Sequence, residues 1–240
     1  KMAQYIIAGP CSMESMEQMD QIAQTLIDLK INYMRAPLFK PRTSPDSFQG
    51  LGKAGLPILE EIKKKYPTLK LVSEICSVEQ FNVLAPYADI LQIGTRNMQN
   101  FELHKNLAPL LESQNKKVIL KRGFANTFFE WIQAAKYYES YGLNKKNIIL
   151  CERGTRNHCA PEGTTLDLCL ALKIKFETDY EVIIDPSHGC GNSLFIPSIA
   201  KAIFQMPFDG MMLECHPDPK NSISDAKQAI SLTELSDLVG

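Results

Sequence analysis

The chain has 240 residues, of which 45% are hydrophobic, and its formal net charge is −1 at pH 7. Barrels of alternating strands and helices reach about 250 residues as one domain, so we expect a single domain over residues 1–240. The balanced charge excludes the broad basic field that attracts nucleic acid or anionic membranes. No apolar run approaches the roughly 18 residues that span a bilayer, and seven scattered cysteines favour a reducing compartment. We therefore expect a soluble cytoplasmic protein.

Short apolar runs rich in β-branched residues recur along the chain and predict strands. They occupy residues 5–8, 33–39, 69–75, 90–93, 118–120, 148–150, 181–184 and 211–213. The segments between them space their apolar residues as helices do, for example in residues 19–29 and 128–138. Apolar strands joined by helical crossovers predict an α/β fold in which a parallel sheet closes into a (β/α)₈ TIM barrel. A doubly wound open sheet is the alternative.

Polar side chains follow every predicted strand. In a barrel the carboxyl ends of the strands share one rim, where the active sites of this fold assemble, so these side chains should converge. Basic residues follow the second, fourth, fifth and sixth strands, whereas cysteine, histidine or glutamate follows the first, seventh and eighth. Because the first, seventh and eighth strands are neighbours in a closed barrel, Cys11, His188 and Glu214 should lie side by side.

These three residues predict a metal site. A thiolate, an imidazole and a carboxylate suit a borderline divalent ion such as Zn²⁺, Mn²⁺, Fe²⁺ or Co²⁺. Asp225, at the start of the last helix, is expected to reach the same point as a fourth ligand. A position left open on such an ion can polarise a substrate carbonyl. The alternative is that Cys11 is an inert cysteine and that His188 bonds only a backbone group.

The rest of the rim is rich in positive charge, which predicts a ligand with several anionic groups. The basic residues are Arg35, Lys40, Arg42, Arg96, Lys121, Arg122 and Arg153. Any one of them alone could form an ordinary surface ion pair, and we expect Glu152 to pair with Arg153 in that way. The KPRTS string at residues 40–44 is more specific, because a guanidinium, hydroxyls and amides on a stiff backbone can surround one phosphate.

Several longer strings are similar to those of one enzyme family. They are AGPCS at residues 8–12, FKPRTSP at 39–45, SFQGLG at 47–52, IGTRNMQNF at 93–101, LKRG at 120–123, LCERG at 150–154, DPSH at 185–188, ECHPDP at 214–219 and SDA at 224–226. On these strings the chain resembles 3-deoxy-D-arabino-heptulosonate 7-phosphate (DAHP) synthase of type I-beta. The resemblance implies a metal-dependent barrel that condenses phosphoenolpyruvate with erythrose 4-phosphate. The products would be DAHP and phosphate, in the first step of the shikimate pathway of aromatic amino-acid biosynthesis.

The resemblance also implies roles for individual residues. One divalent metal ion (Mn, Fe, Co or Zn) would be held by Cys11, His188, Glu214 and Asp225. Phosphoenolpyruvate would be bound by Arg35, Lys40, Arg96, Lys121 and Arg153. Erythrose 4-phosphate would be bound by Arg42, Thr43 and Ser44. The catalytic residues would be Lys40, Cys11, His188 and Glu74, with Glu74 near the reacting enol and its attacking water, while the role of Arg122 stays open.

The chain departs from the family pattern at Pro37-Leu38, Asp46 and Thr95, where no charged partner is lost, and in one region that bears on the sugar site. Asn192 stands where relatives often carry arginine, and residues 160–166 lack a usual arginine–asparagine pair, which puts the sugar contacts there in doubt. Relatives often carry a fused ferredoxin-like or chorismate mutase domain that confers feedback inhibition, and these residues contain neither. Relatives also form dimers or tetramers, so we expect a homo-oligomer.

Three other functions stay open at this point. One is 3-deoxy-D-manno-octulosonate 8-phosphate synthase, which uses arabinose 5-phosphate and typically reads KANRTS where this chain reads KPRTS. Another is a Schiff-base aldolase with Lys121 as its nucleophile. The third is a metabolite-sensing barrel without activity, for which loss of charged ligands would be expected, yet none of the matched charged residues is lost.

Overall fold

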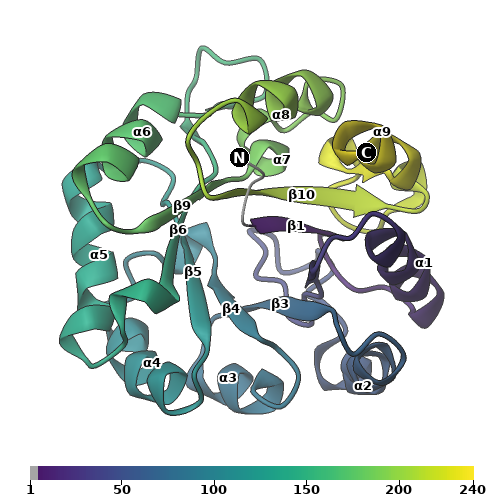
Figure 1. The fold of residues 1–240 in the computed structure, drawn as a ribbon, viewed down its shortest axis with the longest axis horizontal. Coiled ribbons are helices and arrows are strands. Elements are labelled where there is room, and N and C mark those ends of the chain that lie inside the picture. The colour runs from purple at the N-terminus through teal and green to yellow at the C-terminus, as the bar shows by residue number, and fades with distance from the viewer. Residues whose placement is uncertain (1–4) are drawn as a thin grey trace.

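The structure, a computed structural model that describes residues 5–240, shows a ring of parallel strands surrounded by helices (Figure 1). The barrel strands are β1 (Tyr5–Gly9), β2 (Tyr33–Arg35), β3 (Lys70–Ile75), β4 (Ile90–Ile93), β5 (Lys117–Lys121), β6 (Ile148–Glu152), β9 (Glu181–Ile184) and β10 (Gly210–His216). Each strand pairs in parallel with the next, and β1 pairs with β10 from Tyr5–Gly210 to Gly9–Glu214. This last pairing closes the ring, so the (β/α)₈ TIM barrel is confirmed and the open sheet is excluded.

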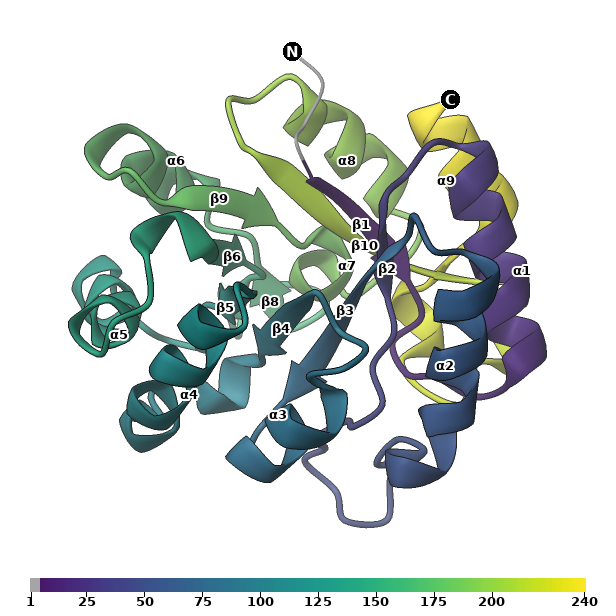
Figure 2. The ribbon, with the colours of Figure 1, turned by 60° about the horizontal axis from the view of Figure 1, so that its bottom comes forward.

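Helices follow the strands along the chain and cover the outside of the barrel (Figure 2). They are α1 (Met16–Asp28), α2 (Leu56–Lys65), α3 (Val78–Leu84), α4 (Phe101–Ser113), α5 (Phe128–Ser140), α6 (Leu168–Glu177), α7 (Pro186–Cys190), α8 (Ile196–Phe204) and α9 (Leu232–Val239). Short 3₁₀ helices are η1 (Gly52–Gly55), η2 (Thr95–Asn97), η3 (Lys145–Asn147), η4 (Pro219–Asn221) and η5 (Ala226–Gln228). Several helices begin after a residue whose side chain accepts a hydrogen bond from a backbone N–H of the first turn. In α5, Thr127 and Glu130 each accept from the other's backbone N–H and form a complete capping box.

The strand predictions differ from the structure in two respects. The second strand was expected to run through residue 39, but β2 ends at Arg35 and its last ladder contact is the bond from Ala36 N to Val72 O. Pro37 has no N–H to continue the ladder. Three further short strands were not predicted: β7 (Thr155–Arg156) pairs antiparallel with β8 (Thr164–Thr165), and β11 (Ile230–Ser231) pairs in parallel with the end of β10.

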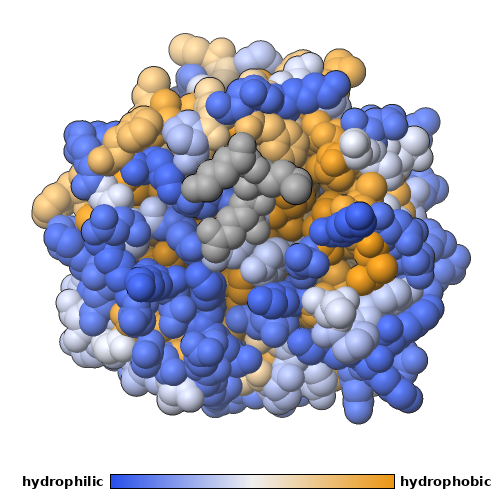
Figure 3. All heavy atoms as spheres, viewed as in Figure 1, coloured by the Kyte–Doolittle hydropathy of each residue, from blue (hydrophilic) through white to orange (hydrophobic). Residues whose placement is uncertain are grey.

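Two apolar cores hold the barrel together. Inside the ring, Ile7, Ile119, Ile149, Ile183 and Met212 pack with their neighbours at no more than 2% exposure. Alternate residues of the same strands face outward and pack against the helices. The face in Figure 3 presents mostly hydrophilic residues over the outer helices. Within residues 5–240, no helix has both the length and the apolar character that a bilayer crossing requires.

Candidate functional site

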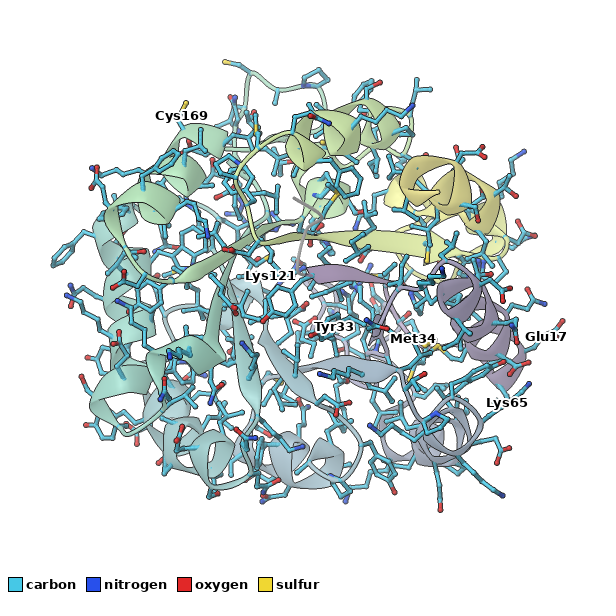
Figure 4. The ribbon with its side chains drawn as sticks, viewed as in Figure 1. Glu17, Tyr33, Met34, Lys65, Lys121 and Cys169 are labelled. Carbon is cyan, nitrogen blue, oxygen red and sulfur yellow. The ribbon has the colours of Figure 1, made fainter. Side chains whose placement is uncertain are left out.

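The charged residues predicted from the sequence meet at the carboxyl ends of the strands. Arg35, Glu74, Lys121 and Glu214 lie in the last residues of β2, β3, β5 and β10 and are all buried. Figure 4 shows Lys121 within the ring of strands, whereas Cys169 lies on an outer helix. A cavity of about 330 Å³ opens above them, lined by Lys40, Pro41, Arg42, Thr43, Ser44, Ser47, Arg96, Phe124, Arg153, His188, Asp225 and Gln228. The predicted convergence on one rim is therefore present.

Four side chains on one side of the cavity form a cluster that we call the metal centre. The potential ligand atoms of Cys11, His188, Glu214 and Asp225 lie within 4.8 Å of one another. The Cys11 thiol donates to Asp225 Oδ2 at 2.7 Å. Asp225 holds a left-handed backbone conformation with φ of 51°, which aspartate tolerates better than most residues. The segment that carries it is tied to the loop after β1 by a 2.6 Å hydrogen bond between Ser224 Oγ and Ser12 Oγ.

Glu214 is the charged core of this cluster. Its Oε1 lies 2.9 Å from Arg35 Nη2 and 3.3 Å from His188 Nε2, and its Oε2 accepts a 2.6 Å hydrogen bond from Gln228. Burial alone would raise the pKa of the Glu214 carboxyl, but His188, Arg35 and Lys40 lower it to about 2. Burial, reinforced by Glu214, raises the pKa of the Cys11 thiol. The carboxylate is thus held ionised in a fully buried position.

Asp185 orients the histidine of the metal centre, a role that we did not predict. It is fully buried; its Oδ1 caps α7 by accepting from His188 N at 3.0 Å, and its Oδ2 lies 2.7 Å from His188 Nδ1. Lys121 Nζ donates to the same Oδ2 at 2.5 Å. Burial opposes ionisation, yet His188 and Lys121 hold the pKa of Asp185 well below its usual range. Its place three residues before His188 in DPSH is a signal that could have identified it.

The residues of the metal centre fit a divalent ion. The donors are a thiol, an imidazole and two carboxylates, a mixed set that suits Zn²⁺, Mn²⁺, Fe²⁺ or Co²⁺. Glu214 Oε1 is buried without a hydrogen-bond partner among residues 5–240, and it contacts Arg35 only as an ion pair at 2.9 Å. An ion at the centre of the cluster would satisfy this oxygen. Asp185 is not one of these donors. It supplies the carboxylate that commonly fixes the ring of a metal-binding histidine from behind.

Arg96, Arg153 and Phe124 line the same cavity, and Lys121 lines a smaller cavity together with them; we call these four residues the anion pocket. Arg153 is only 8% exposed, its Nε is buried without a hydrogen bond, and its one polar contact is with Gly154 O at 3.5 Å. Among residues 5–240 it has no carboxylate within ion-pair distance. Burial lowers the pKa of Arg153. Asp185 and Glu152 stabilise this guanidinium only at longer range. A buried cation without a direct ion-pair partner is stabilised further when a ligand supplies one, so the anion pocket suits an anion.

The KPRTS segment connects the two sides. Arg42 Nη1 donates to Asp225 Oδ2 of the metal centre at 3.2 Å, while Thr43 Oγ1 accepts from Arg96 Nη2 of the anion pocket at 2.6 Å. Ser44 lines the same cavity, and its Oγ accepts from Asp46 N. Buried Lys40 stands between the two sides, with its Nζ 3.8 Å from Glu74 Oε2.

A smaller cavity of about 40 Å³ lies deeper and contains the remaining predicted residue, Glu74. Lys40, Lys121 and Arg153 line it as well. Gln92 Nε2 donates to Glu74 Oε2 at 3.2 Å. A Cβ at position 94 would meet Glu74 Oε1, so Gly94 leaves room for the carboxylate in this position.

Two expectations about the basic residues change. Glu152 was expected to pair with Arg153, but its Oε2 is 3.1 Å from Arg122 Nη1, so that expectation was wrong. Arg122 also contacts Asp167 at 3.1 Å and the Asn126 carbonyl, and it lines neither cavity. These ion pairs and hydrogen bonds occupy the Arg122 guanidinium and connect the loops that follow β5 and β6.

The region of doubtful sugar contacts lies outside both cavities. Asn192 Nδ2 donates to Glu162 Oε1 at 3.0 Å. Residues 160–162 and 164–166 instead line a separate, mostly apolar cavity of about 350 Å³ together with Gly189, Cys190 and Phe195. The departures from the family pattern therefore leave the metal centre and the anion pocket unchanged.

Comparison with known proteins identifies the family. A family model described as the DAHP synthetase I family matches residues 2–239. Phospho-2-dehydro-3-deoxyheptonate aldolase of Thermotoga maritima is 40% identical over 234 residues, which span 98% of this chain and 67% of that protein. A 2-dehydro-3-deoxyphosphooctonate aldolase of Francisella tularensis is 26% identical over 252 residues, spanning 98% of this chain and 88% of that protein.

Solved structures agree with the sequence relatives. The crystal structure of DAHP synthase from Thermotoga maritima matches with a TM-score of 0.89 at 38% identity, covering 98% of this chain and 67% of that chain. A truncated form of the Thermotoga maritima enzyme matches with a TM-score of 0.86 at 35% identity, covering 98% of this chain and 83% of that chain. The resemblance seen in the sequence is thereby confirmed. This chain is an enzyme that belongs to the DAHP synthetase I family.

Proposed function

We propose that this chain condenses phosphoenolpyruvate with erythrose 4-phosphate, using one divalent metal ion, to give DAHP and phosphate. One observation carries the proposal: His188 and Asp225 of a four-donor metal centre line the same cavity of about 330 Å³ as Arg153, a buried arginine without a direct ion pair among residues 5–240. An aldehyde oxygen is polarised by a Lewis acid, and a phosphate is bound by guanidinium groups. The family and the 40% identical relative support this choice of substrates.

In this proposal the basic residues hold both substrates. Arg96, Arg153 and Lys121 bind the phosphate of phosphoenolpyruvate, and Arg35 and Lys40 bind its carboxylate. The phosphate of the aldose lies against Arg42, Thr43 and Ser44. Holding two polyanions together in attacking geometry removes much of the entropic barrier to their reaction.

The chemistry then needs few protein groups. When bound by Cys11, His188, Glu214 and Asp225, a divalent ion supplies Lewis-acid polarisation of the aldehyde oxygen. The enol carbon of phosphoenolpyruvate attacks the aldehyde carbon, and Lys40 donates a proton to the oxygen that becomes a hydroxyl. Positive character develops at the phosphate-bearing carbon, where Glu74 orients a water molecule and accepts its proton. The carbon–oxygen bond to phosphate breaks as the ketone forms.

Two rival functions are less well supported. Lys121 Nζ is buried and donates to Asp185 Oδ2 at 2.5 Å, so this contact occupies the nitrogen that would have to attack a carbonyl in a Schiff-base aldolase. The octulosonate 8-phosphate relatives are only 26% identical, and the chain reads KPRTS at residues 40–44. Arabinose 5-phosphate is therefore the competing substrate to test.

A phosphate-release assay tests the proposed reaction. Protein stripped of metal by chelation is supplied with phosphoenolpyruvate and either erythrose 4-phosphate or arabinose 5-phosphate, and Mn²⁺, Fe²⁺, Co²⁺ or Zn²⁺ is restored one at a time. We expect release only with metal and faster release with erythrose 4-phosphate. Cys11→Ser should abolish metal binding, while Cys169→Ser, a matched change on the outside of α6, should preserve it. Full activity after chelation, or preference for arabinose 5-phosphate, would contradict the proposal.

Other predictions accompany this function. Residues 1–240 would act as one catalytic domain in the cytoplasm, and the chain would assemble into a dimer or tetramer. Light scattering on the purified protein measures that assembly directly.

A further inference from the structure

Phe124, which follows the LKRG string, brings three guanidinium groups together. The Cζ atoms of Arg96, Arg153 and Arg156 lie 5.5, 5.3 and 4.5 Å from the centroid of its ring. The arginines come from three places: η2 after β4, the residue after β6, and β7. Phe124 also lines both cavities of the site. No sequence pattern predicted this arrangement, because Arg96 and Phe124 are distant in the chain from each other and from Arg153 and Arg156.

Three positive groups repel one another, so something must hold them together before an anion arrives. The face of an aromatic ring attracts guanidinium groups through its quadrupole, and a planar guanidinium stacks on it with little loss of freedom. For Arg153 the ring is the main partner, because its only hydrogen bond in residues 5–240 is the 3.5 Å contact to Gly154 O. The ring therefore stabilises the cation on which the anion pocket depends.

Arg156 is tied to Phe124 twice. Its guanidinium lies over the ring, and its backbone N donates to the Phe124 carbonyl at 2.8 Å. Its side chain is exposed, and within the described part of the chain no carboxylate forms an ion pair with it. The short β7–β8 hairpin is thus anchored so that a solvated cation stands beside the two arginines of the anion pocket.

We propose that Phe124 is a positioning residue that holds Arg96 and Arg153 ready for the phosphate of phosphoenolpyruvate, with Arg156 as an additional cation that attracts the incoming anion. This inference rests on the proposed function, since it takes phosphoenolpyruvate as the ligand. It goes beyond that function by assigning roles to two residues outside the family motif set described above. A solely apolar role for Phe124 predicts instead that any side chain of similar bulk serves equally well.

Substitution of the ring distinguishes the two roles. Phe124→Leu keeps the apolar bulk and removes the π face, whereas Phe124→Tyr keeps the ring. We expect Phe124→Leu to weaken phosphoenolpyruvate binding about tenfold, measured by titration calorimetry, and to raise KM for phosphoenolpyruvate by a similar factor. The kcat should stay within about threefold, and Phe124→Tyr should restore binding. Phe124→Met serves in the same experiment if the leucine variant does not fold.

A matched control is available on α5. The Phe128 ring carries Lys173 Nζ at 5.1 Å, a contact of the same kind outside both cavities, so Phe128→Leu should leave phosphoenolpyruvate binding unchanged. Arg156→Gln should lower kcat/KM about threefold at low salt and less at high salt, as expected of steering by an exposed charge.

The outcomes distinguish the positioning role of Phe124 from the proposed reaction. Unchanged phosphoenolpyruvate affinity in Phe124→Leu, or an equal loss in Phe124→Tyr, would overturn the positioning role. If the unsubstituted chain binds phosphoenolpyruvate but releases no phosphate with erythrose 4-phosphate, the positioning role of Phe124 stands and the proposed reaction fails. If it does not bind phosphoenolpyruvate at all, both fail.

Discussion

The metal centre and the anion pocket both contribute residues to one cavity, but their charged side chains differ in whether they have ion-pair partners within the protein. In the metal centre each carboxylate already contacts a cation of the protein: Glu214 lies beside Arg35, and Asp225 beside Arg42. In the anion pocket, Arg153 is buried with no carboxylate at ion-pair distance among residues 5–240. The first region is internally compensated, so the barrel can fold without an ion. The second holds a guanidinium that Asp185 and Glu152 stabilise only at longer range, so a ligand can supply its direct partner.

Glu214→Gln is the most severe test of this contrast. It removes a buried negative charge from beside Arg35, which is itself only 2% exposed. Leaving a buried cation unpaired costs about 3 kcal/mol, so urea unfolding should report a fall in stability of that order. Metal binding, measured by titration, should weaken more than about 100-fold, beyond the loss typical of outer-shell changes. Glu177→Gln, on the surface of α6, is the control, and full stability of Glu214→Gln would refute internal compensation.

Arg153→Met should act in the opposite direction on stability. It replaces a buried, unpaired guanidinium with an apolar chain, so the free energy of unfolding should rise by about 1 kcal/mol. Phosphoenolpyruvate binding should fall about 100-fold, because charge-assisted hydrogen bonds to its phosphate are lost. Metal affinity should not change. Lys201→Met on α8 controls for loss of one exposed charge, and a loss of stability in Arg153→Met would contradict the lack of a direct partner for this guanidinium.

Asp185→Asn should affect both regions at once. Asp185 Oδ2 contacts His188 of the metal centre at 2.7 Å and Lys121 of the anion pocket at 2.5 Å. Removing the charge should lower metal affinity about 10-fold or more, the usual effect of losing the carboxylate behind a ligating histidine. Phosphoenolpyruvate affinity should fall less, since Arg96 and Arg153 do not contact Asp185 directly. Asp237→Asn is the exposed control, and metal affinity equal to that of the parent would remove Asp185 from this role.

Arg42→Gln should produce the smallest change and the only gain in metal affinity. Arg42 competes with a metal ion for Asp225 Oδ2, to which it donates at 3.2 Å in a partly exposed ion pair. Such pairs contribute about 0.2–1 kcal/mol, so metal affinity without substrates should rise by roughly two- to fivefold. Arg42→Lys, which keeps the charge, should show less of this gain. A weaker metal affinity in Arg42→Gln would mean that the guanidinium supports the metal centre instead.

Some features of the site could be predicted from strand order alone. Cys11, His188 and Glu214 follow strands that must be neighbours once the barrel closes, and the structure places their ligand atoms together with that of Asp225. The partners of the arginines could not be predicted in this way. Glu152 precedes Arg153 in the sequence, yet it pairs with Arg122, because successive residues of a strand point to opposite faces.

Periodicity and strand-end chemistry, both local properties of the chain, therefore determined the barrel, the rim and the four candidate ligands. Only the tertiary structure decided which charges are compensated, because burial and pairing depend on side chains brought together from distant segments. The isolation of Arg153, the bridging position of Asp185 and the gathering of three arginines on Phe124 are of this second kind. Each depends on distances between separate strands and loops, and those distances exist only after the ring closes through β1 and β10.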